Sequence, residues 1–428
     1  MAEKGIAQER RTEMKIVIHR GSREIGGSCV EVESRGQRLL VDIGLPLDAE
    51  GDPRQFLPQV KGLDGSDPSL LGILISHPHQ DHFGLLSEVA PTIKTGMGAA
   101  ARRILTAAGP FMPNKYSPPP VGWDFEHRMP ITIGPFTVTP YLVDHAAFDS
   151  YALLIEADGK RLFYSGDFRA HGRKSRIFQE MIADPPKDVD VLLMEGTSLG
   201  RLNADEHFPS EQELEQEFAK AFSATKGVVL VQCSAQNIDR VVSVFRACKR
   251  TGRTLVIDLY AAAILAATGN KSIPQSAWPQ MALLIPQSQR VQIKNNAWFD
   301  LLNAHAANRV FIEDIREAPE KGVILFRSLH CRDLERSECL KDSLFIYSQW
   351  IGYWEDDSMK HVRALLERHK IPRLDIHTSG HASPADLQKF VAAMKPGTIV
   401  PIHSLMPERY QELFPNVAIH HDGEQRQV

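Results

Sequence analysis

Residues 72–83 read Gly-Ile-Leu-Ile-Ser-His-Pro-His-Gln-Asp-His-Phe, and the interpretation of the whole chain starts from them. The apolar run at 72–76 predicts a short buried strand. Directly after it, the six residues from His77 to His82 hold three histidines and one aspartate. That composition would be a costly way to build an ordinary loop, so we interpret it as a cluster of metal ligands.

Similar side chains stand at the ends of three other predicted strands. These strands are 136–143, which leads to His145, 161–165, which leads to Asp167, and 398–402, which leads to His403. In layered α/β folds, loops at strand ends hold polar groups above a rigid sheet. We therefore expect one site to contain His77, His79, Asp81, His82, His145, Asp167 and His403. A lone histidine or aspartate at a strand end is more often a cap or a satisfied core group, so the cluster at 77–82 carries this prediction.

Imidazole and carboxylate ligands suit zinc, manganese and iron, and zinc is the most frequent of the three. Two such ions about 3.5–4 Å apart can activate a water molecule and clamp a phosphoryl oxygen. We therefore expect two divalent metal ions, Zn²⁺ first, with Mn²⁺ as the alternative.

The composition is that of an ordinary soluble protein, with 43% apolar and 24% charged residues. The length of 428 residues exceeds what one core usually serves, so two domains are expected. A net charge of −4 gives no global basic signal, and nucleic-acid binding would require a local basic groove.

Several classes of protein are disfavoured by the sequence. Five cysteines without a CxxC pair favour reduced thiols in the cytoplasm over disulfides or a cysteine zinc site. Residues 1–15 lack the apolar segment of a signal peptide, and the apolar stretch 259–268 is too short to span a bilayer. A cytoplasmic location without membrane contact is the expectation.

Secondary structure follows the apolar patterns. Before residue 195 we predict paired strands over 16–45, a helix at 83–90, an irregular proline-rich loop at 110–120 and a strand at 189–194. After it we predict a helix at 210–224, a strand-helix-strand unit at 227–231, 238–251 and 254–258, and strands at 322–326, 342–347 and 374–377. A further helix begins with Ser383 as N-cap, Pro384 at its first position and Asp386 at its third, and ends at Gly397.

The stretch His77-Pro78-His79-Gln80-Asp81-His82 resembles the HxHxDH signature of the metallo-β-lactamase superfamily. The other elements of that family follow in order: Asp42, His145, Asp167 and His403 match its first, third, fourth and final motifs. The resemblance implies that His77, His79 and His145 hold one metal and that Asp81, His82 and His403 hold the other. It also implies that Asp167 bridges the two metals and that Asp42 braces the site.

The segment between Asp167 and His403 is where the β-CASP nuclease branch carries an inserted domain. Glu195, His381 and His403 resemble motifs A, B and C of that branch. Together with the stretches 21–27, 377–383 and 401–404, they look most like ribonuclease J. The resemblance implies an αββα sandwich with an inserted β-CASP α/β domain. The expected parts are a flexible tail at 1–13, a first sandwich part at 14–205, the insertion at 206–350 and a second sandwich part at 351–428.

Two features depart from ribonuclease J. That family usually carries a further C-terminal domain that supports dimerisation, whereas 25 residues follow His403 here, so homodimerisation is left open. Motif A is glutamate, as in the eukaryotic nuclease that processes pre-mRNA 3′ ends, where ribonuclease J tends to carry aspartate. Exonuclease action in the 5′–3′ direction and endonuclease action therefore both stay open.

The implied function is hydrolysis of RNA phosphodiester bonds, with single-stranded RNA as substrate. Asp81, Asp167, Glu195 and His381 form the predicted catalytic set. Glu195 would hold the ring of His381, which would give a proton to the leaving 3′ oxygen. A cap for a strand end is the alternative role of Glu195.

Predicted phosphate contacts are Ser379, Gly380, His381, Arg169, Arg173 and Lys174. A charge run such as 169–176 is as often a solvated face. The segment 234–237 could bind an anion at a helix N-terminus, but ordinary N-capping is favoured. Two other functions stay open: a hydrolase of DNA or small esters on the same scaffold, and an RNA-binding subunit that does not cut.

Overall fold

The computed structural model describes residues 13–112 and 121–428. The predicted tail at 1–13 lies outside the described residues except for Glu13, and so does the 113–120 part of the predicted proline-rich loop. No helix within the described ranges is long and apolar enough to cross a membrane.

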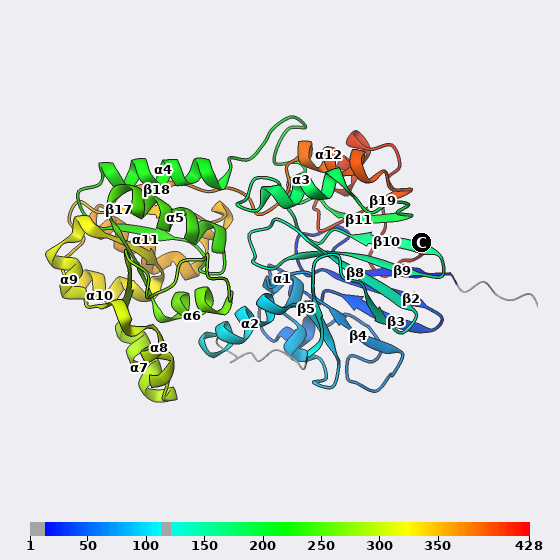
Figure 1. The fold of residues 1–428 in the computed structure, drawn as a ribbon, viewed down its shortest axis with the longest axis horizontal. Helices are drawn as coiled ribbons and strands as arrows, with labels where there is room; N and C mark the ends of the chain where they lie inside the picture. Colours follow the sequence, from blue (N-terminus) through cyan, green and yellow to red (C-terminus); the bar gives the residue numbers. More distant parts are fainter. Residues whose placement is uncertain (1–12, 113–120) are drawn as a thin grey trace, which may run out of the picture.

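Two sheets stack face to face to form the half of the molecule that carries the predicted ligands (Figure 1). The first sheet consists, in spatial order, of β20 (Gln425–Gln427), β1 (Lys15–Arg20), β2 (Cys29–Ser34), β3 (Gln37–Val41), β4 (Leu70–Leu74), β5 (Thr95–Gly98) and β6 (Val121–Phe125). The second consists of β19 (Thr398–Ile402), β11 (Val191–Glu195), β10 (Lys160–Tyr164), β9 (Tyr151–Ala157), β8 (Phe136–Leu142) and β7 (Ile131–Ile133).

The core between these sheets comes from alternating strand residues. Val30 and Val41 of the first sheet pack in one cluster with Leu153, Tyr164 and Val400 of the second, and all five are buried. Strand alternation sends the other residues outward, where helices cover them. This gives the helix-sheet-sheet-helix order that the sequence predicts.

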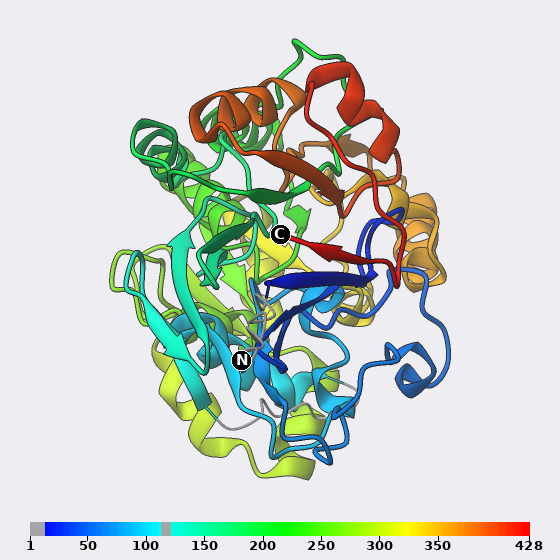
Figure 2. The ribbon, with the colours of Figure 1, turned by 90° about the vertical axis from the view of Figure 1, so that its right-hand side faces the viewer.

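Helices cover the outer face of each sheet. On the first, Leu105 of α2 (Ala99–Ala108) packs with the η2 turn (Leu86–Glu88). On the second, Phe178 of α3 (Ser175–Ala183) packs with Phe390 of α12 (Pro384–Met394). Both ends of the chain belong to this sandwich, because β20 pairs with β1 and β19 pairs with β11 (Figure 2).

A third, all-parallel sheet lies between β11 and β19 in the sequence and forms the other half of the molecule (Figure 1). Its strands, in spatial order, are β15 (Arg309–Val310), β14 (Met281–Leu284), β13 (Thr254–Ile257), β16 (Gly322–Phe326), β12 (Val229–Gln232), β17 (Leu344–Tyr347) and β18 (Arg373–Asp375). One face is covered by α4 (Glu211–Ala224), α5 (Ile238–Thr251) and α6 (Leu259–Ala267). The other is covered by α10 (Cys331–Arg336) and α11 (Lys360–His369).

The predicted boundary at residue 350 is too early. Val362 and Leu365 of α11 are buried against Phe345 of β17, and β18 pairs with β17 as far as Asp375. The apolar face of α11 has no other sheet to cover, so the segment 351–375 belongs with the insertion and not with the sandwich.

The helix predicted at 83–90 is also wrong. A single turn, α1 (Gln80–Phe83), begins earlier and ends at Gly84, and the short η2 turn follows separately. This places Asp81 and His82 in a helical turn directed at the site. The helix α12 starts as predicted, since the Ser383 hydroxyl accepts a hydrogen bond from the Asp386 backbone N–H at 3.2 Å. It ends at Met394, before Gly397, because Lys395 adopts a left-handed conformation with φ of 50°.

Candidate metal centre

The predicted ligands converge where strands of both sandwich sheets end. His77 follows β4, His145 follows β8, Asp167 follows β10 and His403 follows β19. Each side chain is at most 2% exposed. Two stacked sheets thus bring residues more than 300 positions apart to one buried edge.

The ligand atoms form two groups, in each of which they lie within 4.8 Å of one another. The first group is His77, His79 and His145; the second is Asp81, His82, Asp167 and His403. The first group is the set that the resemblance assigns to one metal, and the second contains the three residues that it assigns to the other metal together with Asp167. A third, overlapping group adds Glu195 and His381 to Asp167 and His403.

Several atoms in this cluster lack a partner of their own. Among the described residues, His77 Nε2 and Asp167 Oδ1 are buried and make no hydrogen bond, and His82 Nε2 lies 3.2 Å from Asp167 Oδ2, another proposed ligand. Leaving such groups unsatisfied is costly and uncommon in folded proteins. Nitrogen and carboxylate oxygen donors that converge in this way fit a divalent metal ion.

Electrostatics keep the imidazoles of the first group in the form that a metal requires. Burial, together with the neighbouring His82, lowers the pKa of His77 well below its usual value. Burial and the neighbouring His79 do the same to the pKa of His145. Both rings are therefore neutral near pH 7, and neutral imidazole is the ligand species.

Asp42 lies behind this cluster and fixes the orientation of His82. Its Oδ2 accepts hydrogen bonds from His82 Nδ1 at 2.7 Å, Tyr164 Oη at 2.7 Å and Ser76 Oγ at 2.8 Å. A second bond joins the Ser76 backbone N–H to Asp42 Oδ1 at 2.7 Å. With Nδ1 engaged, His82 presents Nε2 to the site, as carboxylate–histidine pairs do at metal centres.

Other ligands are held in the same way by residues that sequence reasoning did not assign. Thr197 Oγ1 lies 2.8 Å from His403 Nδ1, and Ser76 Oγ lies 3.0 Å from His77 Nδ1. His145 Nδ1 donates to the Gly380 carbonyl at 2.6 Å. The only available signal was proximity, since Thr197 stands two residues after Glu195 and Ser76 directly before His77.

Glu195 and His381 form a hydrogen-bonded pair beside the cluster, with His381 Nδ1 3.1 Å from Glu195 Oε2. The other carboxylate oxygen of Glu195 accepts from the Phe168 backbone N–H at 3.1 Å, which fixes the carboxylate. Burial alone would lower the pKa of His381, but the carboxylates of Glu195 and Asp167 outweigh it and raise this pKa to about 9. The pair therefore favours a protonated, oriented imidazole.

The loop that carries Ser379 and Gly380 lies against the same site. Ser379 Oγ accepts from the His381 backbone N–H at 3.1 Å. A side chain at position 380 would meet His145 Cε1 at 3.2 Å, so glycine lets the loop approach this ring closely. The structure thus brings both predicted phosphate contacts next to His145 and His381.

The prediction that Arg169 contacts substrate phosphate is wrong. Its side chain is fully buried, and its guanidinium donates to Asp239 Oδ2 at 2.7 Å and to the Ser379 carbonyl at 3.1 Å. The guanidinium of Arg173 is engaged nearby, at 2.6 Å from Glu215 Oε2. Lys174 Nζ lies 5.5 Å from the centre of the Phe148 ring.

Arg169 belongs instead to a second buried cluster, here named the arginine cluster. Its members are Arg169, Arg240, Asp144, Glu211 and Asp239. The Arg240 guanidinium donates to Glu211 Oε1 at 3.0 Å and to the Ser348 carbonyl at 3.1 Å. Burial alone would raise the pKa of Glu211, but Arg240 and Arg169 lower it to about 2.

The segment 234–237 is used for capping. The Asn237 side chain accepts from the Arg240 backbone N–H at 3.1 Å, as the N-cap of α5. Ordinary N-capping, which the sequence favoured, is therefore present here.

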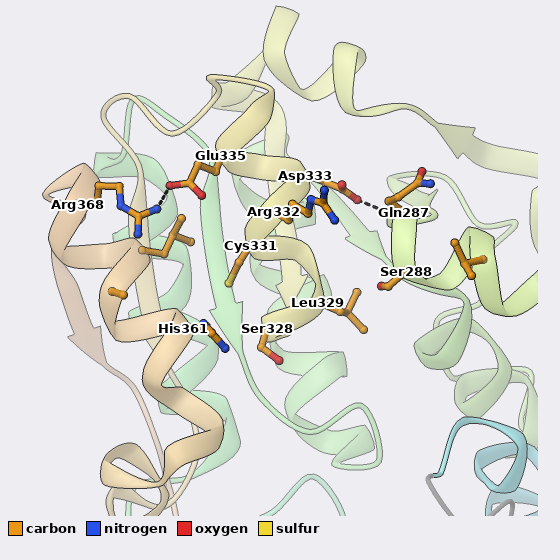
Figure 3. A pocket seen from close by; sticks show the side chains of 13 residues that line it. Gln287, Ser288, Ser328, Leu329, Cys331, Arg332, Asp333, Glu335, His361 and Arg368 are labelled. Carbon is orange, nitrogen blue, oxygen red and sulfur yellow. Dashed lines mark hydrogen bonds and ion pairs between the residues drawn. The ribbon is translucent and has the colours of Figure 1, made fainter.

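A cavity of about 600 Å³ lies away from this centre, between α7 (Gln287–Asn296), α10 and α11 (Figure 3). Three of its charged side chains are engaged in its own wall: Asp333 accepts from the Gln287 backbone N–H, and Glu335 pairs with Arg368. None of the predicted site residues lines it.

Comparisons with known proteins agree with this geometry. Residues 37–231 match the beta-lactamase superfamily domain, and residues 373–408 match the Zn-dependent metallo-hydrolase RNA specificity domain. The first match and the two stacked sheets indicate a metallo-β-lactamase fold, into which the third sheet is inserted. The curated proteins of similar sequence are named ribonuclease J.

The similar proteins include ribonuclease J of Mycoplasma pneumoniae, which is 20% identical over 92% of this chain and 68% of its own length. Ribonuclease J of Sinorhizobium meliloti is 22% identical over 86% of this chain and 64% of its own length. The chain thus spans about two thirds of these relatives. A solved protein of unknown function from Enterococcus faecalis shares the fold over 97% of this chain, with a TM-score of 0.77 and 21% identity.

Proposed function

We propose that this chain is a metal-dependent ribonuclease that hydrolyses phosphodiester bonds of single-stranded RNA, by exonuclease action, endonuclease action or both. One observation carries the proposal. Buried histidine and aspartate side chains converge beside the hydrogen-bonded pair Glu195 and His381, next to a segment that matches an RNA specificity domain. The names of the similar proteins support RNA as the substrate class.

The proposed cofactors are two Zn²⁺ ions, with Mn²⁺ as the alternative. His77, His79 and His145 would hold one ion, Asp81, His82 and His403 the other, and Asp167 both. Such ions, when bound, supply an activated water and neutralise charge on the phosphoryl oxygens.

The remaining roles belong to the chain itself. Glu195 orients His381 through the 3.1 Å hydrogen bond, and His381 holds a proton that it can transfer to the leaving 3′ oxygen. Ser379 and Gly380 border the same space and offer a hydroxyl and an unencumbered N–H to a phosphate. Asp42 keeps His82 in one tautomer and orientation.

The parts of the chain are proposed to divide this work. The sandwich, at about residues 14–205 and from about 376 onward, would provide the metal ligands, and the insertion would cover the substrate. We also propose that the protein is cytoplasmic and forms a homodimer. Neither property changes the chemistry proposed for the site.

Incubation of the metal-loaded full chain with 5′-labelled single-stranded RNA and DNA of the same sequence tests the proposal. We expect RNA to be cut and DNA to be cut far more slowly. The product lengths distinguish removal of single nucleotides from internal cleavage. Equal cleavage of DNA, or activity on a small ester alone, contradicts the RNA assignment and leaves a metallohydrolase of another substrate class. Tight RNA binding without cleavage identifies a non-cleaving subunit.

A further inference from the structure

An exposed aromatic surface borders the metal centre. It consists of Trp350, Ile351 and Tyr353, which are 43%, 55% and 41% exposed. These residues lie at the start of the η7 turn (Ile351–Glu355), which follows β17. Large apolar side chains that cluster on a surface indicate a binding site, whereas single ones do not. We name these three residues the aromatic rim.

Contacts with neighbouring side chains fix the backbone of the aromatic rim. Trp354, the next residue of the turn, packs against the Arg373 guanidinium, which lies 3.9 Å from the centre of its ring. The Tyr347 hydroxyl donates to the Trp350 carbonyl at 3.0 Å, and the Arg363 guanidinium donates to the Trp354 carbonyl. The rim therefore projects its aromatic rings from a fixed backbone, which reduces the entropy lost when a ligand binds.

A cation joins the rim to the catalytic side of the molecule. The Arg201 guanidinium lies 5.3 Å from the centre of the Trp350 ring, within the range of a cation–π interaction. Arg201 belongs to the loop that follows β11 and Glu195, whereas Trp350 belongs to the insertion. This contact therefore bridges the two halves of the molecule beside the site.

The rim also lies close to the proposed metal ligands. Arg201, whose guanidinium lies against the Trp350 ring, follows Glu195 by six residues in the chain. The loop of Arg201 packs on the loop that follows His403: a Cβ at Gly200 would be 2.4 Å from Met406 Sδ. Met406 is itself 44% exposed.

We propose that the aromatic rim and Arg201 form a stacking platform on which bases of a single-stranded RNA lie while its phosphate occupies the metal centre. This inference rests on the proposed ribonuclease function. Aromatic rings and guanidinium planes are the groups on which unpaired bases stack, and stacking tolerates any sequence because every base has a π face. Arg201 adds a positive charge next to the backbone in a chain whose net charge is negative.

The platform also supplies a physical basis for the preference for single strands. Bases in a duplex are already stacked on each other and point inward, so they cannot lie on the rim. An apolar surface of a partner protein is the other conceivable occupant. The guanidinium of Arg201 against the Trp350 ring, on the loop that follows Glu195, favours nucleic acid as the occupant.

Binding of fluorescein-labelled single-stranded RNA by fluorescence anisotropy tests the platform, with the metal-loaded full chain in the slow His381→Ala background. Stacking contributes about 1–3 kcal/mol per base, so Trp350→Ala and Tyr353→Ala should each raise Kd about 5- to 100-fold. Trp350→Phe keeps a π face and should stay within about threefold of the parent, whereas Trp350→Leu keeps only apolar area and should bind as weakly as Trp350→Ala.

Phe311→Ala is the matched control, because Phe311 is a 47% exposed aromatic residue beside β15, at the far edge of the third sheet. It should leave Kd unchanged. Metal content and melting temperature identify any variant that has lost its fold. Unchanged Kd in Trp350→Ala and Tyr353→Ala, or full affinity in Trp350→Leu, overturns the stacking platform alone. Absence of RNA binding and cleavage by the unsubstituted chain overturns the ribonuclease function and the platform together.

Discussion

The metal centre and the arginine cluster are two buried polar clusters separated by one loop, 377–381, and they satisfy their charges in opposite ways. In the metal centre, His77 Nε2 and Asp167 Oδ1 have no hydrogen-bond partner among the described residues, and His82 Nε2 faces only other proposed ligands. In the arginine cluster, the carboxylates of Glu211 and Asp239 are met by guanidinium groups of the chain itself. Buried charge alone therefore does not identify a functional site; the metal centre is distinguished by several unsatisfied ligand atoms that converge on one point.

The two clusters also differ in what they connect. The ligands of the metal centre come from strand ends of the sandwich, whereas the arginine cluster joins the sandwich to the insertion. Arg169 follows β10, and its partners Glu211 and Asp239 belong to α4 and α5. We infer that one cluster performs chemistry and that the other fixes the insertion over it. Substitutions in the metal centre should therefore lower activity or metal affinity, whereas substitutions in the arginine cluster should lower the free energy of unfolding.

The largest effect is expected for His381→Ala. Loss of a general acid typically costs about 10²–10⁴-fold in rate, and His381 lies outside the two metal-ligand sets. We expect RNA cleavage to fall by that factor while metal content, measured by elemental analysis, stays the same. His361→Ala, at an exposed position on α11, is the control. Loss of a metal in His381→Ala would show that this residue is a ligand.

The next effect is a loss of stability in Glu211→Gln. Removing one partner from a buried ion pair costs about 3–5 kcal/mol, because Arg240 is left with an uncompensated charge. Chemical denaturation should show this decrease in the free energy of unfolding, with metal content unchanged in the folded fraction. Glu217→Gln, at an exposed position of the same helix, should stay within about 0.5 kcal/mol. Equal stability of the two variants contradicts the role of the arginine cluster.

The same carboxylate predicts a pH dependence. The folded-state pKa of Glu211 is lowered to about 2 from an ordinary 4.5, so its stabilising contribution is complete above pH 4.5 and is lost as pH falls toward 2. The unfolding free energy of Glu211→Gln should lack this part of the acid dependence. Denaturation curves of both proteins between pH 5 and 3 check it, and parallel pH profiles would be the contrary result.

A smaller effect is expected for Asp42→Asn. Asparagine tolerates the left-handed backbone at this position, where φ is 59°, so the fold should persist. The amide cannot replace the carboxylate that orients His82, and such partners are worth about 10–100-fold in metal affinity. Competition with a metal-binding dye measures the change. An unchanged metal affinity would show that Asp42 does not orient His82 for metal binding.

The smallest effect concerns Lys174, the one residue of the predicted basic trio that remains a proposed phosphate contact. Lys174→Ala should weaken RNA binding equally for all sequences. The slope of log K against log salt should decrease by about 0.7 for one lost contact to a single strand. Arg176→Ala is a control, because Arg176 lies two residues further along and pairs with Glu180 on the surface. Identical salt slopes for both variants would exclude a Lys174 contact.

The difference between the metal centre and the arginine cluster also explains which features could be predicted from the sequence. The run at 77–82 is contiguous, and the other ligands follow apolar strands, so local patterns identify the fold and the candidate ligands. The arginine cluster leaves no such pattern, because Arg169, Glu211 and Arg240 come from three separate elements. The charge run at 169–176 therefore resembled a phosphate-binding surface. Only the packing of α4 and α5 against the sandwich shows that Arg169 is buried.

The boundary of the insertion was missed for a related reason. The segment 351–375 carries a helical pattern that would suit either half of the molecule, and only pairing of β18 with β17 assigns it. The aromatic rim lies at the start of this segment and includes Trp350 directly before it. Its exposure could not be predicted from the sequence, where Trp350 and Tyr353 are indistinguishable from the half-buried Trp354 beside them.

The central claim is that the buried histidine and aspartate side chains at the strand ends bind two metal ions. Elemental analysis of the purified full chain after reconstitution with Zn²⁺ or Mn²⁺, paired with RNA cleavage on the same sample, tests it most directly. The account predicts two metal ions per chain in the active protein and loss of both ions and activity in Asp167→Ala. One ion or fewer per chain with full activity would contradict it.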